Sequence, residues 1–117
     1  MPEMAYYNAG ICAQDAGKLS VAEQHYRRAL ELNQKFSSAL LQLAELKFTA
    51  HDFMSARGFL ERFHSVSQAT ADSLWLGVRI ERSDGNDSKA AEYARRLKAE
   101  FPTSPQAAAV VDAERKK

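Results

Sequence analysis

The feature that most constrains the fold of this chain is an internal repeat with a period of 34 residues. Residues suited to a turn recur at one position of the period, and alanines recur five residues later. The turn set is Gly17, His51 and Gly85, the alanine set is Ala22, Ala56 and Ala90, and a set of large residues is Tyr6, Leu40 and Leu74. A fixed period of this length indicates stacked two-helix units, because one such unit cannot bury its apolar face alone.

Each period is predicted to form a helix, a turn and a second helix. The expected helices cover residues 4–15, 21–32, 38–49, 72–83 and 88–100, and Asp52 or Ser55 is expected to cap one that contains "ARGFLERF". Ser20 and Glu23 have the spacing of a capping box for 21–32. Ser104 is a favourable N-cap and Pro105 a favourable first residue for a seventh helix, 105–116.

The repeat resembles the tetratricopeptide repeat (TPR), a 34-residue helical hairpin. The matching residues are Tyr6, Gly10, Gly17, Ala22, Tyr26 and Ala29 in the first unit, Leu40, Leu43, Ala44, Ala56 and Leu60 in the second, and Leu74, Gly85, Ala90, Leu97 and Pro102 in the third. The small residue of the third unit, Gly77, lies one place early. The resemblance implies an all-α TPR superhelix (an α-α solenoid). It would hold three helix-turn-helix repeats, at about 3–36, 37–70 and 71–104, and a C-terminal capping helix, in one domain of residues 1–117.

The same resemblance predicts a concave groove lined by the first helix of each unit. The residue after the large packing residue points into that groove, and others follow at one-turn intervals. The predicted partner-binding residues are Tyr7, Ile11, Leu41, Glu45, Phe48, Trp75, Arg79 and Arg82, with Gln14 in the same series. Trp, Tyr and Arg are common at binding hot spots. In the alternative interpretation, Trp75 packs inside the superhelix, against the end helix or against a second copy, and Arg79 only pairs with Glu45.

No residue pattern predicts catalysis, a metal site or a cofactor. His25, His51 and His64 lack metal-ligand spacing, and the known catalytic and phosphate-binding motifs are absent. The net charge of +1 gives no electrostatic case for nucleic acid, and no apolar run is long enough for membrane insertion. The single cysteine, Cys12, excludes an internal disulfide. A helical enzyme would instead show a polar pocket with convergent ionisable groups.

Four segments resemble a narrower family. They are "RALELNQKFSSALLQLAELKF", "ARGFLERF", "SLWLGVRIER" and "AAEYARRLKAEFPTS". Together they are similar to the C-terminal half of the type IV pilus biogenesis lipoproteins of the PilF/PilW type, which are pilotins. This resemblance implies a non-catalytic scaffold that supports localisation and assembly of the secretin in the outer membrane. The alternative is a generic TPR adaptor that binds a peptide or protein in another bacterial complex.

The resemblance also implies a partner and a location. The partner would be a secretin subunit or another pilus component, and the parent protein would lie at the periplasmic face of the outer membrane. This sequence shows no signal or lipid anchor, which leaves a cytoplasmic location open. Apolar residues at its N-terminal end, Met4, Tyr6, Tyr7 and Ile11, predict a homo-oligomer formed through exposed repeat ends.

Overall fold

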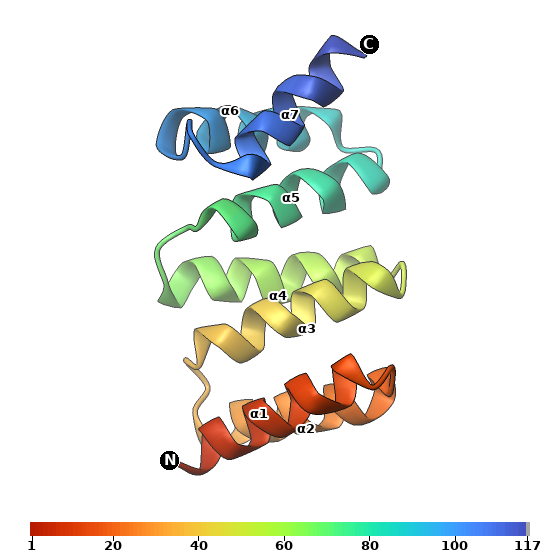
Figure 1. The fold of residues 1–117 in the computed structure, drawn as a ribbon, viewed down its shortest axis with the longest axis vertical. Helices are drawn as coiled ribbons and strands as arrows, with labels where there is room; N and C mark the ends of the chain where they lie inside the picture. Colours follow the sequence, from red (N-terminus) through yellow and green to blue (C-terminus); the bar gives the residue numbers. More distant parts are fainter. Residues whose placement is uncertain (117) are drawn as a thin grey trace. The chain divides into compact units, whose positions relative to one another are not determined.

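The computed structural model describes residues 1–116, and this part of the chain forms seven helices and no strand (Figure 1). The helices are α1 (Pro2–Asp15), α2 (Leu19–Leu32), α3 (Ser37–Thr49), α4 (Phe53–Val66), α5 (Ala71–Ser83), α6 (Asp87–Glu100) and α7 (Pro105–Arg115). The all-α prediction is confirmed. Five predicted helix ends, at residues 15, 32, 49, 83 and 100, agree with the structure, whereas the helices begin one or two residues earlier than expected.

Helix boundaries follow the 34-residue period closely. The second helices of the units, α2, α4 and α6, begin at residues 19, 53 and 87, and each is therefore offset by 34 from the one before. Helices α3, α5 and α7 begin at residues 37, 71 and 105, with the same offset. The end helix α7 thus begins where the first helix of a fourth unit would begin.

The three hairpin turns share one backbone conformation. Gly17, His51 and Gly85 have positive φ angles of 77°, 62° and 81°, in the left-handed region. In each turn two backbone N–H groups donate back to the preceding helix, as in His51 to Phe48 (2.9 Å) and Asp52 to Lys47 (2.9 Å). This is the Schellman arrangement, which satisfies the last carbonyl groups of a helix. His51 therefore holds a conformation that glycine adopts at much lower cost.

The structure comprises two compact units, the first of which is Met1–Ser67. Within it α1 packs on α2, α3 on α4, and α2 on α3. Helices α1 and α2 approach closely at Gly10, where an added Cβ atom would lie 2.5 Å from the ring of Tyr26. Tyr26 is fully buried, and its hydroxyl donates to Oε1 of Gln14 at 2.6 Å. The absence of a side chain at Gly10 is what lets α1 lie against this ring.

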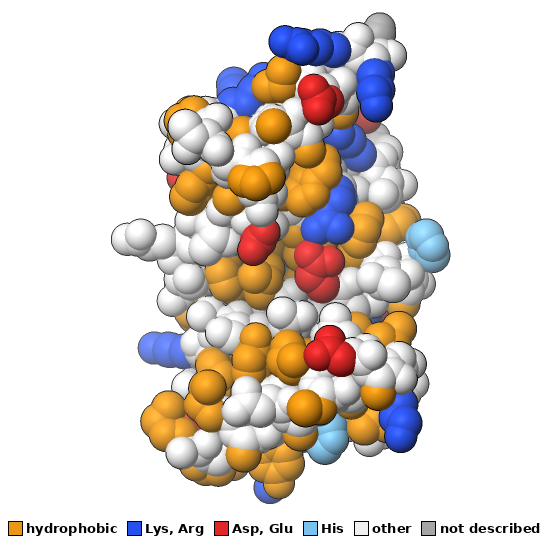
Figure 2. All heavy atoms as spheres, viewed as in Figure 1, with side chains coloured by type: hydrophobic (Ala, Val, Ile, Leu, Met, Phe, Trp, Pro, Cys, Tyr) orange, Lys and Arg blue, Asp and Glu red, His pale blue; other side chains and the backbone are white. Residues whose placement is uncertain are grey.

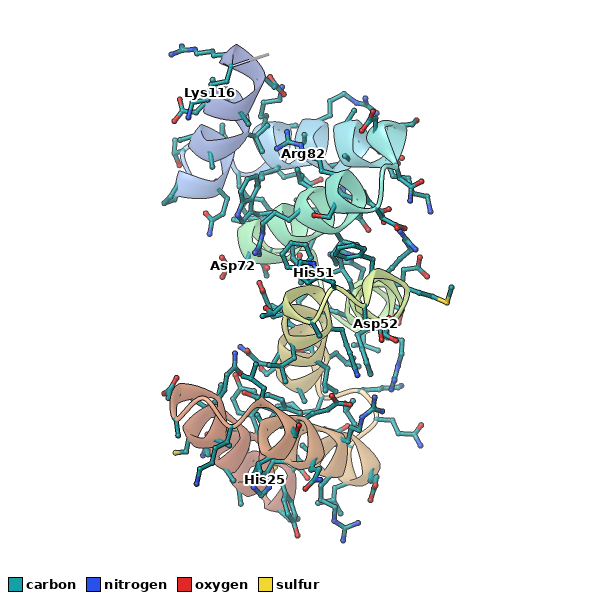
Figure 3. All side chains as sticks on the ribbon, turned by 90° about the vertical axis from the view of Figure 1, so that its right-hand side faces the viewer. His25, His51, Asp52, Asp72, Arg82 and Lys116 are labelled. Carbon is teal, nitrogen blue, oxygen red and sulfur yellow. The ribbon has the colours of Figure 1, made fainter. Side chains whose placement is uncertain are left out.

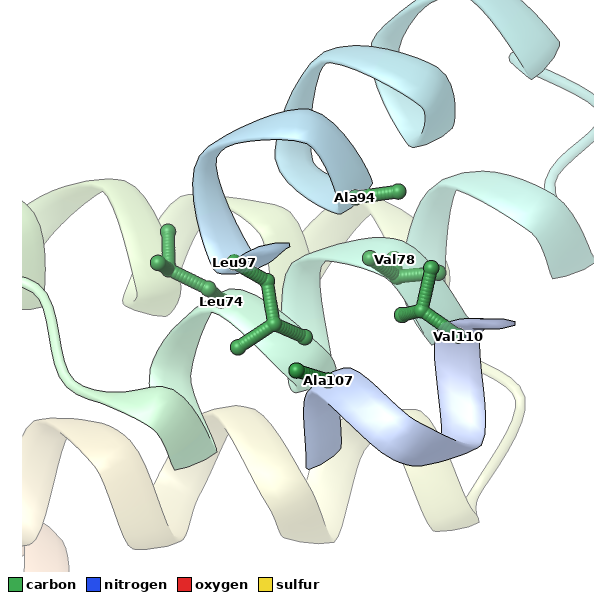
Figure 4. Close-up of a cluster of buried hydrophobic side chains, with 6 residues drawn as sticks. All are labelled: Leu74, Val78, Ala94, Leu97, Ala107 and Val110. Carbon is green, nitrogen blue, oxygen red and sulfur yellow. The ribbon is translucent and has the colours of Figure 1, made fainter. Parts of the chain in front are cut away.

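The second unit begins at Gln68 and holds α5, α6 and α7. It contains a cluster of buried side chains, drawn in Figure 4: Leu74, Val78, Ala94, Leu97, Ala107 and Val110. Gly77 repeats the close approach of the first unit, since an added Cβ atom would lie 2.8 Å from the ring of Tyr93. Leu74 and Val78 are fully buried, and for Leu74 this agrees with its predicted role as a large packing residue.

The helix caps differ in part from the predictions. The capping box of Ser20 and Glu23 is wrong: α2 has Lys18 as N-cap with no side-chain cap bond, and Ser20 lies inside the helix. The helix begins early because the turn itself leads directly into it. The cap at Ser104 is confirmed, with its side chain accepting from the N–H of Ala107, and Asp52 caps α4 through the N–H of Ser55. Thr70 forms a capping box that the sequence analysis missed.

Candidate partner-binding surfaces

In the first unit the predicted binding residues lie on α1 and α3. Tyr7 and Ile11 come from α1, and Leu41, Glu45 and Phe48 come from α3. All five side chains are half-buried. Leu40, the neighbour of Leu41, is fully buried, so the packing and surface positions separate as the period predicts. Figure 2 shows hydrophobic and acidic side chains together on the face that α1 and α3 present.

Tyr7 has a packing role as well as an exposed edge. Its ring centroid lies 5.8 Å from that of Tyr26 and 5.4 Å from that of Phe36. These tilted contacts join α1 to α2 and to the segment that leads into α3. Burial raises the pKa of Tyr26 to about 12, with Tyr7 and Asp15 adding to the effect. Part of the predicted binding surface is therefore the outer side of an aromatic core.

A second aromatic group lies at the turn between α3 and α4. The ring of Phe53 is 6.0 Å from that of Phe48 and 5.8 Å from the imidazole of His51. Gln14 occupies the position of α1 that corresponds to Phe48, and its amide oxygen accepts the hydroxyl hydrogen of Tyr26. Gln14 and Phe48 are thus equivalent in the 34-residue period, but Gln14 presents an amide that is bonded to Tyr26, whereas Phe48 presents a half-buried aromatic ring.

In the second unit Trp75, Arg79 and Arg82 all lie on α5 and are half-buried. The side chain of Trp75 packs against the cluster of Figure 4, to which α7 contributes Ala107 and Val110. The guanidinium carbon of Arg79 lies 5.7 Å from the centre of the indole ring. Gln106 at the start of α7 donates to Oδ1 of Asp72 at the start of α5 (2.6 Å).

The position of Trp75 is compatible with both interpretations that the sequence left open. The ring packs against a core shared with the end helix, and part of it remains accessible. Stacking of a guanidinium on an indole is worth about 0.5–1 kcal/mol at an exposed site. The arrangement fixes the orientation of both side chains, which lowers the entropy that they lose on binding a partner.

No group of three or more His, Cys, Asp or Glu residues suited to a metal ion occurs within residues 1–116. His25 and His51, labelled in Figure 3, come from α2 and from the α3–α4 turn and do not point toward one another. Within the same residues, no helix is long and apolar enough to cross a membrane.

The sequence analysis missed one surface of the first unit, which lies on α2 and α4. The guanidinium carbons of Arg27 and Arg62 lie 5.4 Å and 5.7 Å from the ring centre of Phe59. Two adjoining hollows of about 290 Å³ and about 270 Å³ are lined by these three residues and their neighbours. No sequence pattern links Arg27 to this surface, because Arg62 and Phe59 lie far from it in sequence.

Glu23 is the carboxylate nearest this surface. It accepts from Nε of Arg27 at 2.8 Å and pairs with Nζ of Lys47 at 3.1 Å. The hydrogen bond from Arg27, helped by Lys47, lowers the pKa of Glu23 although partial burial acts in the opposite direction. The carboxylate of Glu23 thus forms ion pairs with both Arg27 and Lys47.

Comparison with known proteins gives a consistent relationship. No family model matches the chain. It is 27% identical over 99 residues to the type IV pilus assembly protein PilF of Pseudomonas aeruginosa, a match covering 85% of this chain and 39% of that protein. The chain therefore spans well under half of this curated relative.

Solved structures show the same fold. The crystal structure of PilW, a widely conserved type IV pilus biogenesis factor, matches 94% of this chain and 50% of that chain, with a TM-score of 0.86 and 33% identity. The structure of Pseudomonas aeruginosa PilF matches 98% of this chain and 50% of its own, with a TM-score of 0.81 and 24% identity. The N-terminal domain of stress-induced protein-1 from C. elegans matches 96% of this chain and 94% of its own, with a TM-score of 0.81 and 20% identity.

These relatives are TPR proteins, which confirms the helical repeat fold predicted from the sequence. TPR folds generally act as scaffolds that bind protein or peptide partners. Most of the chain is thus homologous to PilF, and its structure matches those of PilW and PilF, TPR proteins of type IV pilus biogenesis.

Proposed function

We propose that this chain is a non-catalytic scaffold segment of a type IV pilus assembly factor, of the pilotin kind, that binds a secretin subunit. The observation that carries the proposal is the match to PilW, since it combines 33% identity with a TM-score of 0.86 over 94% of the chain. The relationship to PilF in sequence points to the same process. A location at the periplasmic face of the outer membrane belongs to this proposal.

The surfaces that would bind the partner are the half-buried residues of α1 and α3 in one unit and of α5 in the other. Tyr7, Leu41 and Trp75 offer apolar area that is already held in place by packing. Arg79 and Arg82 offer guanidinium groups for carboxylates or carbonyl oxygens of the partner. Half-buried aromatic and arginine side chains of this kind are typical of binding hot spots.

The test is binding of a purified secretin subunit from a type IV pilus system, measured by isothermal titration calorimetry. We expect saturable binding by the wild-type chain and a rise in Kd of at least about tenfold for Leu41→Ala and for Arg82→Ala. Arg95→Ala, which removes an exposed arginine of α6, is the matched control and should leave Kd unchanged. Circular dichroism melts establish that all variants remain folded.

The outcomes separate the two parts of the proposal. An unchanged Kd for both Leu41→Ala and Arg82→Ala would disprove the binding surfaces assigned to α1 and α3 in one unit and to α5 in the other. A wild-type chain that binds no secretin subunit would contradict the pilotin function and favour the generic adaptor. Sedimentation of the same samples over a range of concentrations tests the predicted self-association through Met4, Tyr6, Tyr7 and Ile11.

A further inference from the structure

A second surface of the first unit has features that the proposed function does not use. It lies where the hollows of α2 and α4 meet, around the ring of Phe59. The ring itself is only 9% exposed, so it forms an apolar floor rather than a projecting group. Arg27 from α2 and Arg62 from α4 both lie against it. Two guanidinium groups are thereby held close together in a hollow of the surface.

The charges around this hollow do not balance. Glu23 is shared between Arg27 and Lys47, and Arg62 makes no ion pair with any residue in 1–116. Glu31, which also lines one hollow, is already paired with Arg28 at 2.6 Å. An excess of positive charge therefore remains beside the ring, although the chain as a whole carries only +1. The chemistry that complements it is a carboxylate.

Gly58 gives an independent indication that something approaches this surface. It lies in the interior of α4 and lines one of the hollows. A glycine inside a helix destabilises it relative to alanine. At Gly10 and Gly77 a neighbouring ring requires the glycine, but a Cβ atom at Gly58 would meet nothing within 4 Å. No internal contact explains this glycine, whereas close approach of a ligand backbone would.

We propose that the hollow between α2 and α4 binds an extended acidic peptide segment of a partner protein. One carboxylate of the segment is held by the guanidinium groups of Arg27 and Arg62, its backbone passes over Gly58, and an apolar side chain covers the edge of Phe59. Arginine suits this role because its planar group can stack on the ring and still donate two parallel hydrogen bonds to a carboxylate. This surface is separate from the residues of α1, α3 and α5 in the proposed function.

The test is fluorescence anisotropy with a fluorescein-labelled peptide of sequence GEELEEG, at about 50 mM salt, where charge interactions are weakly screened. We expect saturable binding that weakens as salt increases. Arg62→Gln should raise Kd at least about fivefold, and Arg62→Lys should recover only part of that loss because lysine keeps the charge without the planar fork. Arg95→Gln removes an equally exposed cation from α6 and should leave Kd unchanged.

Gly58 supplies a matched pair of variants. Gly58→Leu would fill the hollow and should raise Kd at least about fivefold, whereas Gly58→Ala places only a Cβ atom in the path of the peptide backbone and should raise Kd by about two- to fourfold. Both substitutions favour the helix, so loss of folding does not obscure the result.

Three results would overturn the proposal: no saturable binding of GEELEEG, equal binding by wild type and Gly58→Leu, or equal binding of a GKKLKKG peptide. If single-stranded oligothymidylate bound more tightly than GEELEEG, the proposal would be wrong, and the ligand of the hollow would be a nucleic acid and not an acidic peptide.

Discussion

The contact between Gly10 and Tyr26 makes a prediction whose magnitude can be worked out from the structure. In Gly10→Ala the new methyl carbon would lie 2.5, 2.7 and 3.0 Å from three carbons of the Tyr26 ring. Carbon atoms in favourable contact are about 3.5–4.0 Å apart, so the ring or the helix must move by about 1 Å. The ring cannot swing away freely, because it is fully buried and its hydroxyl is bonded to Gln14. Overpacking of this kind costs about 1–3 kcal/mol.

The helix itself gains from the same substitution, by about 1 kcal/mol, so the expected net loss for Gly10→Ala is about 0–2 kcal/mol. The matched control is Gly58→Ala, which makes the same chemical change in a helix of the same unit but meets nothing within 4 Å. We expect this control to stabilise the chain by about 0.5–1 kcal/mol. Urea unfolding followed by circular dichroism measures both values, and the m-values must agree for the comparison to hold.

The second 34-residue repeat, which holds α3 and α4, indicates how the clash is relieved. Positions equivalent to Gly10 and Tyr26 hold Ala44 and Leu60 there, both of which are buried. Tyr26→Leu alone should cost about 2–3 kcal/mol through the cavity and the lost hydrogen bond. In the double variant Gly10→Ala/Tyr26→Leu the methyl group fills part of that cavity, so the loss should fall short of the sum by about 1–2 kcal/mol. Additivity within about 0.5 kcal/mol, or equal stability of Gly10→Ala and Gly58→Ala, would refute the steric argument.

Three further predictions concern single residues. His51→Gly should stabilise the chain by about 0.5–1 kcal/mol in thermal or urea unfolding, because glycine adopts the positive φ angle without strain, and this gain exceeds the loss of the edge contact with Phe53. A loss of stability would show that the ring contact contributes more than the backbone strain costs. Burial raises the pKa of Tyr26 from 10.0 to about 12, so the contribution of its neutral hydroxyl to stability is complete below pH 10 and is lost as pH rises toward about 12. An ultraviolet titration should show one tyrosine that ionises at higher pH than the others, and this step should be absent in Tyr26→Phe. Thr70→Ala should cost about 1 kcal/mol through loss of the capping box, whereas Ser20→Ala, inside α2, should cost less than about 0.5 kcal/mol; equal costs would contradict the cap assignment.

The sequence predicts the helices well because the turns are strongly specified. A residue at positive φ favours glycine, and Gly17 and Gly85 mark two of the three turns directly. His51 is identified only through the period, since histidine alone gives no turn signal. The helix starts were less certain because the turns before α2 and α6 lead into these helices without a side-chain cap, so the capping-box spacing of Ser20 and Glu23 does not mark the start of α2.

The candidate sites were harder to predict, because exposure depends on contacts between segments far apart in the sequence. The period distinguishes the packing position of Leu40 from the surface position of Leu41, and it places Trp75 next to a packing residue. In the structure Leu40 is fully buried, whereas Leu41 and Trp75 are half-buried. It does not reveal that Trp75 packs against the cluster shared with α7. The hollow on α4 depends on Arg27 of α2 meeting Arg62 across 35 positions of the sequence, and neither residue belongs to a motif.

Gly77, the displaced glycine of the third 34-residue repeat, determines how such repeats can be exchanged between proteins. Gly10 and Tyr26 are 16 residues apart, and Gly77 and Tyr93 are also 16 apart, although the later pair falls one place short of the 34-residue register. The glycine and the ring it accommodates have therefore shifted together on two different helices, while the turn at Gly85 has kept its place. A chimera that transplanted α5 alone into the first repeat would set the ring of Tyr26 against the Cβ atom of Val78. The smallest interchangeable part of this protein is thus the complete hairpin.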